Sequence, residues 1–159
     1  MSNLHLLAGQ AVRQAIETKR TVATAESLTA GIVSAVLADT PGASGMLQGG
    51  VVAYQNSVKE TVLHVPADLL ARVGSVDPDV ACAMAAGART ELGADVGLST
   101  TGVAGPDAHD GKPVGRVYIG ISTAAGTSAF EYSFTGSRPD IRAAACAAAL
   151  ERLLEALAA

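Results

Sequence analysis

Positive charge and aromatic side chains are scarce in this sequence. Its 159 residues include 11 Lys and Arg against 15 Asp and Glu, which gives a net charge of −4, and there is no Trp. Binding to nucleic acid is not expected, because affinity for a phosphate backbone depends on clustered Lys and Arg. The hydrophobic content of 49% instead indicates a compact globular protein.

Cysteines and long apolar runs are also few. Cys82 and Cys146 lie in apolar helical patterns without the spacing of metal ligands, which is typical of reduced thiols in a cytosolic protein. No uninterrupted apolar run reaches the roughly 18 residues that cross a membrane, and no secretory signal is recognisable. We therefore expect a cytoplasmic protein with no metal site and no membrane partner.

The common signatures of nucleotide binding and hydrolysis are missing. There is no G-x-G-x-x-G, no G-x-x-x-x-G-K-[ST] and no G-x-S-x-G. The S-x-x-K pattern of other serine hydrolases is absent at Ser27, because Ala30 stands three residues later. A Ser-His-Asp triad is not supported either, since His5 and His64 lie in helical segments and His109 lies in a polar turn that we expect to be solvated.

Predicted strands and helices alternate along most of the chain. Apolar or alternating runs predict strands at 21–25, 48–54, 95–101, 115–123 and 127–134, with helical periodicity before, between and after them. A turn at 124–126 joins the last two strands as a hairpin. This order favours a three-layer α/β/α sandwich with a mixed, mainly parallel sheet of about five strands, in a single domain over residues 1–159.

The stretch 21–31, TVATAESLTAG, is the strongest functional signal in the residues themselves. A short apolar strand ends there, the chain turns at Glu26 and Ser27, and an apolar helical pattern follows. A serine at such a turn lies near unpaired backbone N–H groups of the helix, which favour an anion and can stabilise an oxyanion. The simpler alternative is that Ser27 or Thr29 caps the helix, as both residue types do well.

Three segments end predicted strands at what should be one edge of the sheet. Ser27 follows the first strand, Tyr54 ends the second, and the small-residue loop 102–106 follows the third. In open α/β sheets, ligands bind beyond the carboxyl ends of the strands. We therefore expect the site there, with backbone N–H groups near 29–31 or 101–105 as candidate oxyanion donors.

A serine nucleophile without a histidine needs another base, and Lys59 is a candidate. Lys59 lies in the first turn of a predicted helix, where the helix dipole disfavours a cation. It would serve as a neutral base if burial or nearby positive charge lowered its pKa. Tyr54, five residues earlier, could relay a proton or donate a hydrogen bond. The structural alternatives are a solvated surface lysine and a tyrosine at the edge of the core.

Six segments occur in a telling order: AESLTAG (25–31), LQGGVVAYQNSVKETVL (47–63), VDPDVACAMAAGAR (76–89), TGVAGP (101–106), KPVGRVYI (112–119) and GSRPDIR (136–142). Together they resemble the C-terminal domain of the CinA (competence/damage-inducible) proteins, also found as the stand-alone nicotinamide-nucleotide amidase. The resemblance implies an anticodon-binding-domain-like α/β/α fold. It also implies hydrolysis of nicotinamide mononucleotide to nicotinate mononucleotide and ammonia in pyridine nucleotide salvage, with Ser27 as nucleophile, Tyr54 and Lys59 assisting, and no cofactor.

The expected substrate contacts come from the loops, a glycine pair and an arginine. We expect Arg142 to bind the phosphate of the nucleotide, with Arg138 as the second choice. The full set of expected substrate-binding residues is Thr29, Ala30, Gly31, Gly49, Gly50, Thr101, Gly102, Gly105 and Arg142.

The chain departs from the family pattern beside the nucleophile. The family usually reads AESCTGG, and this chain has Leu28 for the Cys and Ala30 for the first Gly. Two other functions therefore stay open: an amidase for a different small amide, and a non-catalytic nucleotide-binding or regulatory module that would not need a neutral Lys59. We also expect a homo-oligomer, with a dimer favoured.

Overall fold

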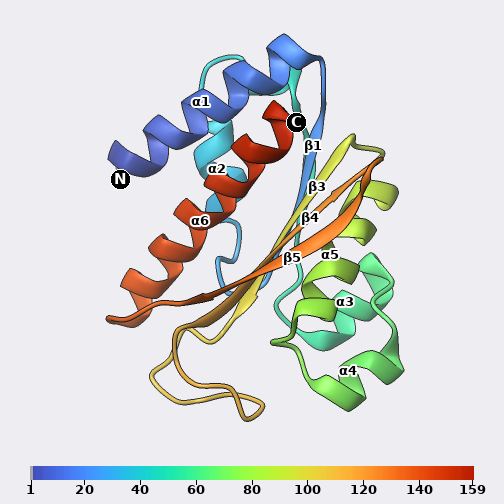
Figure 1. The fold of residues 1–159 in the computed structure, drawn as a ribbon, viewed down its shortest axis with the longest axis vertical. Helices are drawn as coiled ribbons and strands as arrows, with labels where there is room; N and C mark the ends of the chain where they lie inside the picture. Colours follow the sequence, from blue (N-terminus) through green and yellow to red (C-terminus); the bar gives the residue numbers. More distant parts are fainter. Residues whose placement is uncertain (1) are drawn as a thin grey trace.

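The computed structural model describes residues 2–159, and a five-stranded sheet lies at its centre (Figure 1). The strands are β1 (Val22–Glu26), β2 (Leu47–Val52), β3 (Val96–Gly102), β4 (Arg116–Thr123) and β5 (Gly126–Ser133), in the spatial order β2-β1-β3-β4-β5. β1 pairs in parallel with β2 and β3, whereas β4 runs antiparallel to β3 and β5. All strands except β4 therefore share one direction, and the predicted mixed, mainly parallel sheet is confirmed.

Helices cover both faces of the sheet. α1 (Ser2–Thr18), α2 (Ile32–Ala38) and α6 (Arg138–Ala158) lie on one face, and α3 (Asn56–Leu63), α4 (Ala67–Val73) and α5 (Pro78–Glu91) lie on the other (Figure 1). A short 3-10 helix, η1 (Ala43–Gly45), precedes β2. The predicted three-layer α/β/α sandwich is thus confirmed.

Local chemistry explains where the long helices begin. Ser137 forms a capping box with Asp140 at the start of α6. Asp77 accepts the N–H of Asp79 at the start of α5, where Pro78 takes the first helical position. Both arrangements satisfy backbone N–H groups that have no partner within the helix.

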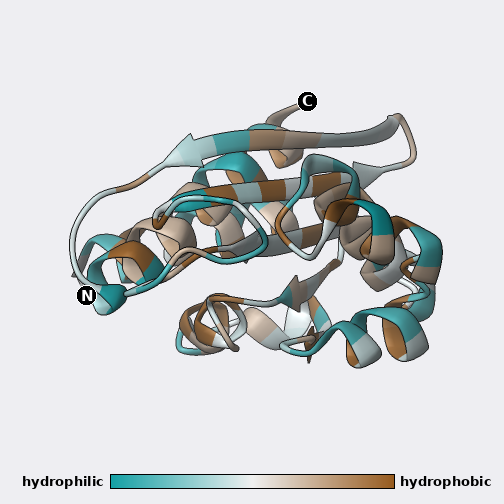
Figure 2. Cartoon of the chain, turned by 90° about the horizontal axis from the view of Figure 1, so that it is seen from below, coloured by the Kyte–Doolittle hydropathy of each residue, from teal (hydrophilic) through white to brown (hydrophobic). Residues whose placement is uncertain are grey.

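The apolar cores lie between the sheet and the two helix layers. All five residues of the interior strand β1 are buried, because helices pack on both of its faces. The edge strand β5 is largely exposed or half-buried and shows mostly pale and hydrophilic colours in Figure 2. Two of the three strands that lead into the candidate site, β1 and β3, are therefore interior and buried, whereas the third, β2, is the other edge strand.

α5 packs closely against the sheet because glycines face it. A Cβ on Gly97 of β3 would overlap the carbonyl oxygen of Ala85 on α5, and a Cβ on Gly120 of β4 would overlap that of Ala81. These positions tolerate no side chain unless the helix moves away.

Replacing Gly97 by Ala should lower the free energy of unfolding by about 1–3 kcal/mol, the usual penalty for overpacking. Gly45→Ala is the matched control, because a Cβ there would meet the Ile16 side chain at an ordinary 3.5 Å. Urea denaturation measures both variants. Equal stability of Gly97→Ala and the wild-type protein would show that α5 can move away from β3 without penalty.

Candidate active site

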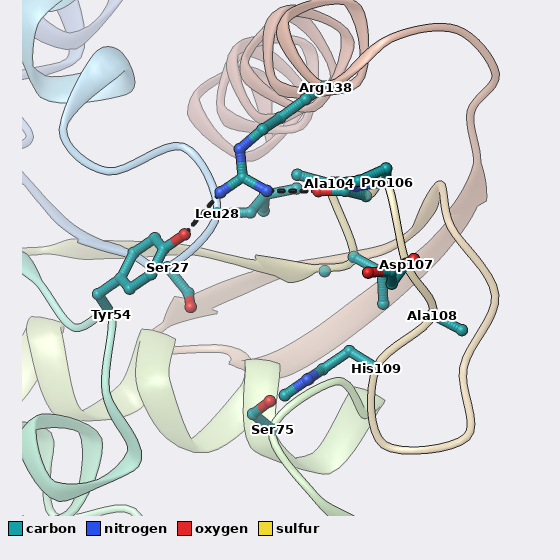
Figure 3. Close-up of a pocket in the computed structure, with 13 residues that line it drawn as sticks. Ser27, Leu28, Tyr54, Ser75, Ala104, Pro106, Asp107, Ala108, His109 and Arg138 are labelled. Carbon is teal, nitrogen blue, oxygen red and sulfur yellow. Dashed lines mark hydrogen bonds between the residues drawn. The ribbon is translucent and has the colours of Figure 1, made fainter.

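A cavity of about 300 Å³ opens at the carboxyl ends of the parallel strands (Figure 3). Ser27 directly follows β1, Tyr54 lies two residues beyond the end of β2, and the loop after β3 forms the opposite wall. Leu28, Ser75, residues 102–109 and Arg138 complete the lining. The topology therefore brings together the three segments that the sequence placed at strand ends.

Lys59 lies directly against Ser27. Its side chain is among the largest that the fold buries completely, with 1% exposed. Its Nζ is 3.1 Å from the Oγ of Ser27, 2.8 Å from the carbonyl oxygen of Ala53 and 3.2 Å from that of Tyr54. The alternative of a solvated surface lysine is therefore wrong.

Burial sets the protonation chemistry of this amine. It lowers the pKa of Lys59 from 10.5 to about 8, while the negative charge of Asp110 opposes part of the shift. As an ammonium, Lys59 donates to all three oxygens. As a neutral amine, it keeps its two N–H groups on the two carbonyls, and the lone pair is left to accept the hydroxyl proton of Ser27. The site is thus arranged for a lysine general base.

Tyr54 contributes its backbone to Lys59 and its side chain to the cavity. The side chain is 50% exposed, and its hydroxyl accepts a hydrogen bond from Nη2 of Arg138 at 2.8 Å (Figure 3). Because Lys59 already contacts Ser27, no relay through the phenol is needed. The assisting role expected of Tyr54 stays a prediction, and the geometry favours a contact with substrate.

The turn after β1 differs from the expected strand-to-helix turn. α2 begins only at Ile32, and its N-cap is Gly31, with φ of 99° and no side-chain cap. The alternative in which Ser27 or Thr29 caps the helix is therefore wrong.

Glu26 occupies the helix terminus that we expected to face an anion. Its carboxylate accepts the N–H groups of Val33 at 2.9 Å and Ser34 at 3.0 Å. The positive end of α2 is thus paired with a buried carboxylate of the protein. Sequence reasoning missed this role, although Glu26 is the one charged residue within 21–31.

The expected substrate-binding residues divide into two groups. Gly102 and Gly105 line the cavity. The others lie outside its lining: Gly49 and Gly50 lie within β2, Thr29 and Thr101 are buried, and Ala30 and Gly31 form a left-handed turn with φ of 49° and 99°. Their contact with substrate stays a prediction.

The two candidate arginines of α6 have different hydrogen-bond partners. Nε of Arg142 donates to the carbonyl oxygen of Leu28 at 2.8 Å, and Nη2 donates to that of Thr29 at 3.2 Å. Its guanidinium therefore holds the turn after Ser27. Arg138, the second choice, lines the cavity and donates to the carbonyl oxygen of Gly105 at 2.5 Å.

The turn containing His109 is exposed to solvent, as expected, and it also forms one side of the cavity. Its anchor is Asp110, which accepts the N–H of Ser75 at 3.0 Å and the hydroxyl at 3.1 Å. The backbone hydrogen bond from Ser75 lowers the pKa of Asp110. The side chain of His109 faces the cavity near Ser75 (Figure 3). No spacing rule in the sequence signals these contacts.

Metal and thiol chemistry find little support within residues 2–159. No group of three or more His, Cys, Asp or Glu in this range could hold a metal ion. Cys82 and Cys146 are free, and burial raises the pKa of Cys146 to about 12. Over the same range, no helix is long and apolar enough to cross a membrane.

The family model of the CinA C-terminal domain matches residues 5–157. The chain belongs to the CinA C-terminal domain family. A protein named competence-damage inducible protein, from Desulforamulus reducens, is 52% identical over 86% of this chain and 33% of the relative. A CinA-like protein from Frankia casuarinae is 44% identical over 90% of this chain and 33% of the relative. The chain thus spans about a third of the length of these curated relatives.

Solved structures of CinA proteins have the same fold. A CinA superfamily protein from Klebsiella pneumoniae superposes with a TM-score of 0.94 at 31% identity, covering 98% of both chains. The competence/damage inducible protein CihA from Agrobacterium tumefaciens superposes with a TM-score of 0.93 at 31% identity, covering 99% of this chain and 96% of that one. The expected CinA-type fold is therefore confirmed.

The pKa of Lys59 predicts how stability depends on pH. Between pH 8 and 10.5, the unfolded chain keeps a proton on Lys59 that the folded protein has lost. The free energy of unfolding should therefore rise by about 1.4 kcal/mol per pH unit within this window, relative to a Lys59→Met variant. Below pH 8, Lys59 is protonated in both the folded and the unfolded state. The difference in the free energy of unfolding between the wild-type protein and Lys59→Met should therefore be constant there. Parallel curves for the two proteins in urea melts from pH 7 to 10.5 would contradict the lowered pKa.

Proposed function

We propose that this CinA domain is a serine amidohydrolase acting on nicotinamide mononucleotide. The observation that carries the proposal is the buried Nζ of Lys59, 3.1 Å from the Oγ of Ser27 at the edge of a cavity. A lysine held neutral by burial is a known way to activate a serine without histidine. The overall reaction converts a carboxamide and water into a carboxylic acid and ammonia.

In the first step, Ser27 attacks the amide carbon while the lone pair of Lys59 takes the hydroxyl proton. The C–O bond forms as the carbonyl oxygen becomes an oxyanion. Collapse of this intermediate breaks the C–N bond, and Lys59 returns the proton to the leaving nitrogen, so that ammonia departs. Water then attacks the acyl-serine with Lys59 again as base, which releases the acid and restores Ser27.

Backbone N–H groups next to Ser27 are the best candidates to stabilise the oxyanion. Within residues 2–159, the N–H groups of Leu28 and Thr29 have no hydrogen-bond partner, whereas that of Ala30 donates to Ser27. The N–H that follows a nucleophile is a common oxyanion donor. Arg142 supports this arrangement, because it binds the carbonyl groups of both Leu28 and Thr29.

Arg138 is the preferred candidate for the substrate phosphate. Its side chain lines the cavity, whereas the guanidinium of Arg142 is committed to two carbonyls. Arg138 is exposed and spans the cavity mouth between Tyr54 and Gly105. A phosphate can replace such neutral partners, since charge-assisted hydrogen bonds to guanidinium are stronger.

Ammonia release from nicotinamide mononucleotide tests the reaction and its nucleophile together. Ser27→Ala and Lys59→Met should each lower turnover by about 10³-fold or more, because nucleophile and base act as a unit. Ser57→Ala, at an exposed serine of α3, is the matched control and should retain full activity. Turnover near the wild-type level in Ser27→Ala would remove Ser27 from the mechanism.

The same assay decides between the alternative functions. Tight binding of the nucleotide without ammonia release would favour the non-catalytic binding module. Release from another small amide, but not from nicotinamide mononucleotide, would keep the mechanism and change the substrate. The expected homo-oligomer stays a prediction that sedimentation of the purified protein would test.

The pH dependence of kcat/KM should report the base. Only neutral Lys59 can accept the proton, so the rate should rise about tenfold per pH unit below its pKa and level off above about pH 8. Tyr54→Phe should keep this midpoint, because Lys59 contacts Ser27 directly. A midpoint that moves in Tyr54→Phe would instead place the phenol in the proton path.

A further inference from the structure

Glu26, the residue before the nucleophile, is buried and fully engaged. Its side chain is 1% exposed and is absent from the cavity lining. Oε1 accepts the hydroxyl of Thr29 at 2.7 Å and the N–H of Val33 at 2.9 Å. Oε2 accepts the N–H and the hydroxyl of Ser34 at 3.0 and 2.8 Å. Four donors thus saturate the carboxylate.

These contacts impose a direction on two hydroxyl groups, those of Thr29 and Thr100, which link Glu26 to the backbone N–H of Ser27. The hydroxyl proton of Thr29 is given to Glu26, so in the 2.8 Å contact between Thr29 and Thr100 the Thr29 oxygen must accept and Thr100 must donate. The oxygen of Thr100 is then free to accept the N–H of Ser27 at 3.3 Å. The same N–H donates to the carbonyl oxygen of Thr100 at 2.9 Å.

We propose that Glu26 is the positioning residue of the nucleophile. Its acceptor-only carboxylate fixes the turn 27–31 between β1 and α2, and thereby aims the Oγ of Ser27 at the Nζ of Lys59. The proposal uses the proposed function only in taking Ser27 as an activated nucleophile. A positioning residue acts through the accurate placement of the nucleophile and needs no contact with substrate. Misplacement of a reacting group by about 1 Å can lower a rate by about 10²-fold.

Glu26→Gln is the sharpest test, because it keeps the shape and replaces one acceptor oxygen with an NH₂ donor. That NH₂ would face two donors, and the direction of the Thr29–Thr100–Ser27 chain would no longer be fixed. Glu26→Asp keeps two acceptor oxygens on a shorter stem. Asp95→Asn is the matched control, because Asp95 accepts the N–H of Thr21 at 2.8 Å at the opposite end of β1 and β3.

The readout is covalent labelling of Ser27 by a fluorophosphonate, measured on the full chain at pH 9 over a range of probe concentrations. Glu26→Gln should lower the maximal labelling rate by about 10- to 100-fold, with the half-saturating probe concentration unchanged. Glu26→Asp should recover part of the rate, and Asp95→Asn should label like the wild-type protein. Urea melts give the folded fraction of each variant, to which the rates are normalised.

Several results would overturn the proposal: a normal maximal rate in Glu26→Gln, an equal loss in Asp95→Asn, or no gain in Glu26→Asp over Glu26→Gln. No labelling of the wild-type protein would remove Ser27 as an activated nucleophile, and the proposal with it. Labelling that depends on Glu26 without ammonia release from any amide would support the proposal and reject the amidase. The two failures are therefore distinguishable.

Discussion

The burial of one amine is the constraint on which the candidate site depends. An isolated buried charge is destabilising by several kcal/mol. Lys59 is stabilised by two backbone carbonyls, those of Ala53 and Tyr54, in the short connection between β2 and α3. The third partner, the hydroxyl of Ser27, comes from the end of β1. The parallel pairing of β1 with β2 places both strand ends side by side. The same contacts that make burial of Lys59 tolerable are thus the contacts that make it a base.

The features that the sequence could predict are those set by nearby residues. Strand periodicity and the hairpin at 124–126 depend on local pattern, and they led to the right sheet and layers. Lys59 was found because a cation in the first turn of a helix opposes the dipole. The features that the sequence could not show depend on contacts between distant residues: Arg138 meets Tyr54 across 84 positions, and Arg142 meets Leu28 across 114. Glu26 was missed although its donors lie within eight positions, on Thr29, Val33 and Ser34, because the turn that folds them back onto the carboxylate has no signature in the sequence.

The two arginines of α6 show how helix geometry divides these tasks. Arg138 and Arg142 are four residues apart, so they project from the same face of the helix, one turn apart. Arg138 is the first residue of α6 and is exposed, so it reaches the cavity mouth. Arg142, one turn further into the layer, reaches the carbonyl groups beneath the nucleophile turn. Sequence spacing predicts that both face the site, but depth along the helix decides which one a ligand can meet.

The two departures from the family pattern differ in their consequences, because only one of the two residues lines the cavity. Leu28 is 4% exposed, belongs to the larger apolar core and also lines the cavity. Its side chain therefore changes the shape of the pocket, while its carbonyl stays bound to Arg142. Ala30 is exposed outside the cavity lining and has φ of 49°, so its methyl group adds backbone strain of about 1–2 kcal/mol without touching the pocket. A difference in substrate choice between this chain and its relatives should therefore be sought at Leu28, whose side chain lines the cavity next to the nucleophile.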